Sequence, residues 1–243
     1  MRSTELVSLS GAVAVVTGGG RGIGQAIATK LAAMDAAVVL TGRDGIRVQQ
    51  VAADLSSRGH KVEGIACDVT NLAGVEALGE RLRTTYGKVD ILINNAGTGG
   101  PPGLLHELPP ADWEAIFNTN LRGVYYMLRA VVPLMIAAGA GHIVNISSLA
   151  GKNPLPRGAA YSASKWGLNG LTYGVAEELR AQNIRVSVIC PGSVDTDFSP
   201  RRGGKDMQKM LKPDDIAHAV VMLVTQQPQS FISEVLIRPT QKP

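Results

Sequence analysis

The chain has 243 residues, of which 45% are hydrophobic, so it is long enough to bury one large α/β core and short for two domains. Its formal net charge is only +4. The basic residues gather at one place alone, Arg201, Arg202 and Lys205, which is weak evidence for a nucleic-acid surface. We therefore expect no nucleic-acid partner.

Cys67 and Cys190 stand far apart, and each ends an apolar run, so we expect two buried free thiols and a reducing compartment. The polar N-terminus shows no signal-peptide pattern, and the apolar run 12–16 is too short to span a membrane. These features predict a cytoplasmic protein without a membrane segment. The sequence also contains no metal-binding pattern.

Short β-branched runs alternate with longer amphipathic stretches along the whole chain. The predicted strands are 13–16, 37–40, 62–66, 91–93, 142–146, 185–189 and 235–237. The predicted helices are 23–34, 46–57, 72–86, 111–138, 159–182 and 214–225. This alternation predicts a doubly wound parallel α/β sheet of about seven strands, a Rossmann fold, with helices on both faces. We expect one domain, residues 1–243, to carry both the cofactor and the substrate site.

A glycine-rich turn follows the first predicted strand and precedes a helix. Glycines at this place allow a tight turn and let backbone N–H groups approach a pyrophosphate at the helix N-terminus. The spacing is Gly-x-x-x-Gly-x-Gly rather than the more familiar Gly-x-Gly-x-x-Gly. The predicted cofactor-binding residues of this turn are Gly18, Gly20, Arg21, Gly22, Ile23 and Gly24.

Arg43 follows the second predicted strand, where dinucleotide sites often carry an acidic residue for the adenosine ribose. An arginine suits a 2′-phosphate instead, and Arg21 adds a second cation nearby. The sequence therefore favours NADP(H), with NAD(H) as the alternative. The competing interpretation is that both arginines are merely solvated.

Polar residues follow the third and fourth predicted strands. Asp68, with Val69, either accepts a hydrogen bond from the adenine amino group or caps the helix that starts near Leu72. Asn95, Ala96 and Gly97 suit close packing against a ribose, or form a turn whose asparagine side chains satisfy the backbone. Both pairs of interpretations are open at this point.

Tyr161 and Lys165 are four residues apart on a predicted helix, so they share one face. A free tyrosine has a pKa of about 10, and a neighbouring lysine favours the phenolate and lowers that pKa toward the range useful for acid–base catalysis. Ser148 follows the apolar run 142–146 and could present its hydroxyl to the same substrate oxygen. Asn120 interrupts an apolar helical stripe, where it either bonds the helix backbone and bends it or holds a water beside the site.

Taken in order, these motifs resemble those of the short-chain dehydrogenases/reductases, in their compact single-domain branch. The resemblance implies that Tyr161 transfers the proton, Ser148 stabilises the substrate oxygen, and Lys165 lowers the pKa of the phenol and contacts the nicotinamide ribose. It also implies that Asn120 holds a water in a relay to Lys165. The nicotinamide-side residues implied by the family pattern are Pro191, Gly192, Val194 and Thr196, followed by a substrate lid at 197–212.

The resemblance implies an NADP(H)-dependent oxidoreductase that interconverts a carbonyl compound and an alcohol. β-Ketoacyl carrier-protein reductases are the most similar branch, but the ending 235–243 departs from their Asp-Gly-Gly-type tail. The alternatives are an inert dinucleotide-binding sensor or scaffold and an NAD-dependent alcohol dehydrogenase. A small-residue stripe, formed by Ala163, Gly167, Gly170 and Gly174, together with the family pattern predicts a homodimer or homotetramer.

Overall fold

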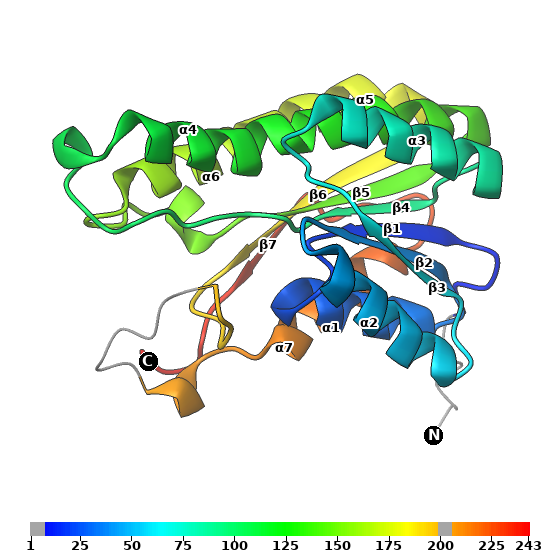
Figure 1. Cartoon of the computed structure of the whole chain (residues 1–243), viewed down its shortest axis with the longest axis horizontal. Coiled ribbons are helices and arrows are strands. Elements are labelled where there is room, and N and C mark those ends of the chain that lie inside the picture. Colours follow the sequence, from blue (N-terminus) through cyan, green and yellow to red (C-terminus); the bar gives the residue numbers. More distant parts are fainter. Residues whose placement is uncertain (1–7, 199–205) are drawn as a thin grey trace.

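The computed structural model describes residues 8–198 and 206–243. The predicted basic cluster and part of the expected lid fall at 199–205, outside the described residues. A seven-stranded parallel sheet in the order β3-β2-β1-β4-β5-β6-β7 forms the centre of the molecule (Figure 1). The strands are β1 (Val13–Thr17), β2 (Ala37–Gly42), β3 (Val62–Ala66), β4 (Ile91–Asn94), β5 (Gly141–Ile146), β6 (Ile184–Pro191) and β7 (Glu234–Ile237). The predicted Rossmann-type sheet is confirmed.

Helices cover both faces of this sheet, as the strand–helix alternation predicts (Figure 1). One layer holds α1 (Gly22–Ala33), α2 (Gly45–Ser57) and α7 (Pro213–Val224). The other holds α3 (Leu72–Tyr86), α4 (Pro110–Phe117), α5 (Gly123–Ala138) and α6 (Ala159–Leu179). Short 3₁₀ turns are η1 (Leu105–Glu107), η3 (Leu149–Gly151), η4 (Arg180–Gln182) and η5 (Met207–Lys209).

The apolar stripes of the helices make two cores, one on each face of the sheet. Leu31 of α1 and Leu223 of α7 are fully buried with the side chains of one sheet face. Leu82 of α3 and Val131 of α5 are fully buried with those of the other face. Every residue of β1 is buried, because this central strand is covered by both layers. Cys67 and Cys190 are buried free thiols, as expected.

The helix predicted at 111–138 departs from α geometry in its middle. A π-helical turn, η2 (Asn118–Arg122), separates α4 from α5. Asn120, which is fully buried, sits at the centre of this turn. π-Turns of this kind are frequent at functional sites. The uninterrupted helix was therefore a wrong prediction at the one position where a polar residue breaks the apolar stripe.

The run Pro110–Ala138 is 29 residues long with a mean hydropathy of 1.3, so length and composition alone would let it cross a membrane. Its packing is that of a core helix, because Met127 and Met135 are buried beside β4 and β5. The sequence predicts a helix over 111–138, and the buried apolar residues of this run serve the core.

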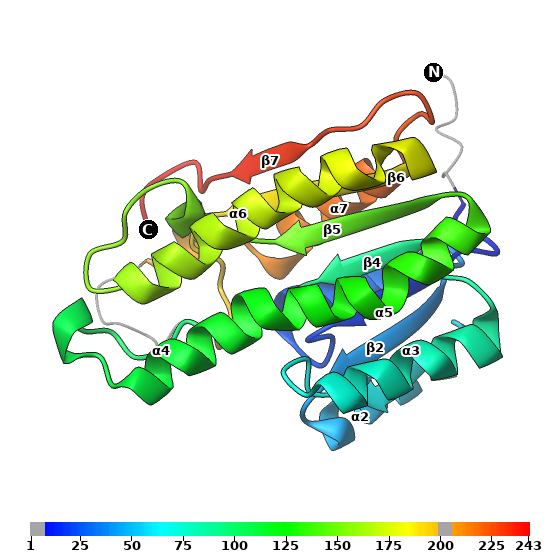
Figure 2. The ribbon, with the colours of Figure 1, turned by 90° about the horizontal axis from the view of Figure 1, so that it is seen from above.

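All the strands point the same way, so their carboxyl ends meet at one edge of the sheet (Figure 2). β1 lies between β2 and β4, and the chain changes direction of winding there. In open α/β sheets, such a switch point opens a crevice that binds ligands. Side chains at this edge come from the loops after β1, β2, β4, β5 and β6. These loops therefore determine which ligand the edge can bind.

Candidate active site

A cleft of about 1210 Å³ lies at the carboxyl edge of the sheet. Sites for one drug-sized ligand measure roughly 300–1,000 Å³, so this cleft has room for a long cofactor and a second small molecule. Gly24 and Asn120 are the two predicted site residues that do not line it. Those that line it are Gly18, Gly20, Arg21, Gly22, Ile23, Arg43, Asp68, Val69, Asn95, Ala96, Gly97, Ser148, Tyr161, Lys165, Pro191, Gly192, Val194 and Thr196.

The glycine-rich turn has the geometry that a dinucleotide phosphate requires. Gly18 and Gly22 take left-handed backbone angles, with φ of 64° and 54°. A β-carbon at Gly24 would lie 2.3 Å from the Gly18 carbonyl oxygen, so Gly24 serves the close packing of α1 under the turn rather than direct contact with a ligand. Within the described residues, no side chain caps the N-terminus of α1, which leaves its N–H groups to an anion.

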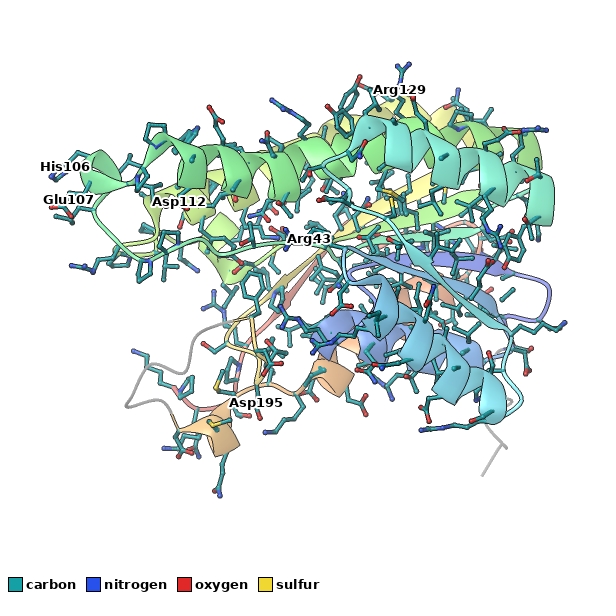
Figure 3. All side chains as sticks on the ribbon, viewed as in Figure 1. Arg43, His106, Glu107, Asp112, Arg129 and Asp195 are labelled. Carbon is teal, nitrogen blue, oxygen red and sulfur yellow. The ribbon has the colours of Figure 1, made fainter. Side chains whose placement is uncertain are left out.

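Three arginines line the cleft: Arg43 and Arg47 follow β2, at the predicted adenosine end, and Arg21 lies in the glycine-rich turn. Arg43 lies at the carboxyl edge of the sheet between the helix layers, while His106 and Glu107 are far out beyond α4 (Figure 3). Arg47 was missed in the sequence, although it lies in the first turn of the helix that follows Arg43. Its side chain passes over the glycine-rich turn, with Cγ 3.1 Å from the position of a Gly20 β-carbon.

The carboxylate of Asp44 could have bound the hydroxyls of an unphosphorylated ribose. In the structure it binds Arg47 instead. Its Oδ1 accepts a hydrogen bond from the backbone N–H of Arg47 at 3.0 Å and so caps α2. Its Oδ2 lies 3.9 Å from Nε of Arg47. The negative charge at this end is therefore partly compensated, and the local balance favours an anionic ligand.

The residues after β3 and β4 mainly support the cleft floor. Asp68 Oδ1 accepts from the N–H and the hydroxyl of Thr70, at 2.9 and 2.8 Å, while Asn71 caps α3. The capping interpretation of Asp68 was therefore wrong. Asn95 Nδ2 donates to the carbonyls of Thr17 and Gly18, at 2.9 and 3.2 Å. The alternative in which this side chain satisfies backbone groups is correct, and it ties β4 to the turn after β1.

Ser148 and Tyr161 meet at the other end of the cleft. Ser148 begins the turn after β5, and its Oγ accepts from the Ala150 N–H at 3.1 Å. The same hydroxyl hydrogen-bonds to the Tyr161 phenol, which lowers the pKa of the phenol. The predicted pair of a hydroxyl and a phenol is thus brought together from two segments.

Lys165 reaches the site from one turn further along α6. Its Nζ donates to the Ile146 carbonyl at 2.9 Å and lies 5.9 Å from the centroid of the Tyr161 ring. Burial lowers the pKa of Lys165 to about 8. The chain thus holds an amine with a pKa close to neutral beside a phenol.

The phenol pKa is not lowered as the Tyr–Lys spacing predicts. Burial raises the pKa of Tyr161 to about 12, and the hydrogen bond from Ser148 only partly offsets this. The prediction failed because it counted the charge of Lys165 and left out desolvation, which disfavours the phenolate. Additional positive charge is needed at this end of the cleft to make the phenol a good acid at neutral pH.

Asn120 lies behind the cleft and braces it. Its Oδ1 accepts from the Thr98 N–H at 2.8 Å, and its Nδ2 donates to the Thr98 carbonyl at 2.9 Å and to Ser164 Oγ at 3.0 Å. The amide therefore joins the loop after β4 to α6, and it makes these contacts rather than a bond to the helix backbone. Gly97 separates Asn120 from Lys165, since its β-carbon would lie 3.2 Å from Asn120 Oδ1 and 3.7 Å from Lys165 Nζ.

The C-terminal segment also lines the cleft, and its residues are missing from the predicted site. Gly192 N–H donates to the Ile237 carbonyl at 2.8 Å, so the end of β7 runs beside the loop after β6. A β-carbon at Gly192 would lie 2.9 Å from Pro239 Cδ. The lining residues of this segment are Arg238, Pro239, Thr240, Gln241, Lys242 and Pro243. The signal that could have found them is the parallel pairing of β7 with β6.

The arrangement combines an anion-binding end and a proton-transferring end in one cleft. The uncapped helix, the left-handed glycines and the arginines fit a phosphorylated dinucleotide. The phenol, hydroxyl and amine fit acid–base chemistry on an oxygen. Such a set suits hydride transfer to or from a carbonyl carbon held between the two ends.

Comparison with known proteins agrees with this geometry. The family model for short chain dehydrogenases matches residues 12–206. An uncharacterized oxidoreductase of Staphylococcus saprophyticus is 38% identical over 237 residues, which cover 96% of this chain and 100% of that protein. A metagenomic short-chain oxidoreductase, solved in complex with NADP, is 49% identical with a TM-score of 0.85, over 96% of this chain and 99% of that one.

A second solved structure is similar over the same range. It is an alcohol dehydrogenase from the archaeon Thermococcus sibiricus complexed with 5-hydroxy-NADP, 32% identical with a TM-score of 0.88, over 96% of this chain and 98% of that one. The family model and the relatives thus cover the sheet, the glycine-rich turn and the Ser–Tyr–Lys set together. The chain belongs to the short-chain dehydrogenase/reductase family and is an oxidoreductase.

Proposed function

We propose that this protein is an NADP(H)-dependent carbonyl reductase that interconverts a ketone or aldehyde with an alcohol. The observation that carries the proposal is one cleft that holds Arg21, Arg43 and Arg47 together with Ser148 and Tyr161. The relatives solved with NADP or a modified NADP support the choice of cofactor. We propose that one domain carries both sites, since the same cleft holds both ends.

When bound, the cofactor supplies the hydride and, in its oxidised form, a positively charged ring. The chain supplies the remaining steps. Ser148 donates a hydrogen bond to the substrate oxygen and stabilises its developing charge. Tyr161 gives its proton to that oxygen in the reductive direction, and Lys165 returns the phenolate to the neutral form. We propose that Asn120 holds a water in the relay to Lys165, from a position fixed by the bonds of its side chain to Thr98 and Ser164.

The lining of the cleft supports further proposed cofactor contacts. Asp68 and Val69 would hold the adenine, Ala96 and Gly97 would contact the ribose, and the loop after β6 would hold the nicotinamide. The residues proposed for that loop are Pro191, Gly192, Val194 and Thr196.

We propose a homodimer or homotetramer that uses the outer face of α5 and α6. Tyr125 and Trp166 on this face are 51% and 53% exposed, which is unusual for large aromatic side chains. A β-carbon at Gly170 or Gly174 would meet nothing within 4 Å, so another surface can approach closely. Light scattering of the purified protein tests this, and a monomer mass at micromolar concentration contradicts it. The proposed location is the cytoplasm.

The functional proposal is tested by a screen of NADPH consumption against ketones, aldehydes, β-ketoacyl thioesters and quinones, with NADH in parallel. Turnover of at least one carbonyl class with a preference for NADPH supports the proposal. Tight NADPH binding without turnover of any class favours the alternative of a dinucleotide-binding sensor. Equal use of NADH would contradict the preference for NADP(H), and a preference for NADH would favour an NAD-dependent alcohol dehydrogenase.

A further inference from the structure

Two large apolar side chains stand exposed at the mouth of the cleft beside the phenol. Leu155 is 47% exposed and Phe198 is 42% exposed, and both line the cleft with Tyr161. Exposed leucine and phenylalanine side chains in a concave site mark a surface that a ligand covers. They come from different segments, the turn before α6 and the loop after β6.

Leu155 is held in place by the first turn of α6. Its N–H donates to Ser162 Oγ at 3.3 Å, and its carbonyl accepts from the Gly158 N–H at 3.0 Å. A β-carbon at Gly158 would lie 2.8 Å from Leu155 Cδ2, so the side chain is pressed against that position. Arg157 takes a left-handed φ of 59° to close this turn, a strained conformation for a residue other than glycine. Leu155 is therefore fixed relative to Tyr161, which precedes Ser162.

Phe198 faces the phenol from the opposite loop. Its ring centroid lies 6.1 Å from that of Tyr161, with an interplanar angle of 51°. Cε1 of the same ring lies 3.5 Å from the position of a Gly99 β-carbon, so Phe198 also touches the loop after β4. The Phe198 ring thus lies within the range of aromatic packing with the Tyr161 ring, on the side of the cleft where the phenol stands.

Uncharged side chains contribute to the wall of the cleft beside this pair. Asp197, which directly precedes Phe198, already has a partner in Arg21 at 3.9 Å. Next to Ser148 and Leu155 the lining residues include the apolar Leu149 and Pro154 and the uncharged Asn153. A charged substituent placed there would lose hydration and meet no opposite charge from these residues, whereas an apolar one gains contact area.

We infer that Leu155 and Phe198 form a subsite for a bulky apolar, ring-sized substituent on the carbonyl carbon of the substrate. This inference rests on the proposed function and names its substrate class: ketones or aldehydes with an aryl or similar apolar group. Acetophenone, acetone and pyruvate differ in that substituent, which is a phenyl ring, a methyl group or a carboxylate.

Binding is measured without turnover, so that failure of catalysis and failure of the subsite are separate results. In a Tyr161→Phe background loaded with NADPH, each carbonyl compound is titrated against the fluorescence of the bound cofactor. We expect acetophenone to bind at least about 10-fold more tightly than acetone or pyruvate, as differential burial of apolar groups allows. Equal binding of the three, or tighter binding of pyruvate, overturns the subsite even if the enzyme reduces carbonyls.

Variants locate the effect. Leu155→Ala and Phe198→Ala each lower the acetophenone-to-acetone selectivity about 10-fold, and Phe198→Leu restores part of it. Met222→Ala is the control, because Met222 is similarly exposed on α7 and does not line the cleft. The Kd of NADPH confirms that the variants fold and bind cofactor. Unchanged selectivity in both alanine variants contradicts the inference.

Discussion

Lys165 donates a hydrogen bond from Nζ to the Ile146 carbonyl at 2.9 Å while only 4% of the residue is exposed. The amine is therefore held at the end of β5, directly before the turn that carries Ser148. Burial lowers its pKa to about 8, so the folded state binds this proton less tightly than the unfolded state does. Burial of the Lys165 amine therefore lowers the free energy of unfolding at neutral pH.

Replacement of this amine should stabilise the protein and abolish activity. A lysine whose folded pKa is lowered from 10.5 to about 8 destabilises the fold fully below about pH 8, and the cost disappears as the pH rises to about 10.5. Lys165→Met should raise the free energy of unfolding by about 1–2 kcal/mol near neutral pH, after loss of the bond to Ile146. Urea denaturation at several pH values measures this. A variant that is less stable at neutral pH and shows no pH trend relative to wild type contradicts the account.

Arg47 should contribute to selection of the phosphorylated cofactor. It lines the adenosine end of the cleft and passes over Gly20. Arg47→Ala should raise the Kd of NADPH about 10-fold, the equivalent of one charge-assisted hydrogen bond of about 1.5 kcal/mol, and change that of NADH much less. Arg58→Ala is the control, since Arg58 pairs with Asp54 at the far end of α2. An equal loss for NADPH and NADH would show that Arg47 does not read the phosphate.

Gly24 should tolerate no side chain. A β-carbon there would lie 2.3 Å from the Gly18 carbonyl oxygen, which is backbone and cannot move without opening the turn. Gly24→Ala should weaken NADPH binding at least about 10-fold, because the N–H groups that face the phosphate shift. Gly74→Ala on α3 is the matched control, as its nearest neighbour would be 3.7 Å away. Isothermal titration measures the Kd of NADPH for both variants. An unchanged Kd in Gly24→Ala refutes the packing role of Gly24.

The fold was largely predictable because its signal is local. The continuous apolar run of β1 predicts a strand. The stripe of Val75, Leu78 and Leu82 predicts the helix α3. The π-turn at Asn120 could not be read, since it depends on bonds to Thr98 and Ser164, which lie far away in the sequence.

The site was predictable where a motif is contiguous and unpredictable where it is assembled in space. The glycine-rich turn and the Tyr161–Lys165 spacing both lead to the cleft. The direction of the Tyr161 pKa shift was missed, because the sequence shows neighbouring charges and hides burial. Pro239 was missed as a wall of the cleft, because only the pairing of β7 with β6 brings it to Gly192.

His142 should make the fold sensitive to mild acid. Burial, with a smaller contribution from Arg185, lowers the pKa of His142 from 6.5 to about 3, and its Nε2 lies 2.8 Å from Ser187 Oγ. The unfolded state therefore binds this proton first, and stability falls as the pH drops from about 6.5 toward 3.

The measurement compares wild type with His142→Gln, which keeps a polar group near Ser187. From about pH 7 to about pH 4, wild type should lose roughly 2–3 kcal/mol more in the free energy of unfolding than the variant. Parallel acid profiles of the two proteins would assign the loss to other groups.

The central claim is that Tyr161 is the proton donor of a cofactor-loaded cleft, and Tyr161→Phe tests it most directly. The change removes one oxygen and keeps the ring beside Phe198, so the Kd of NADPH should stay within about 2-fold of wild type. The kcat for a carbonyl substrate found in the screen should fall at least about 100-fold, as expected for loss of a general acid. A variant that binds NADPH normally and retains wild-type kcat would contradict the account.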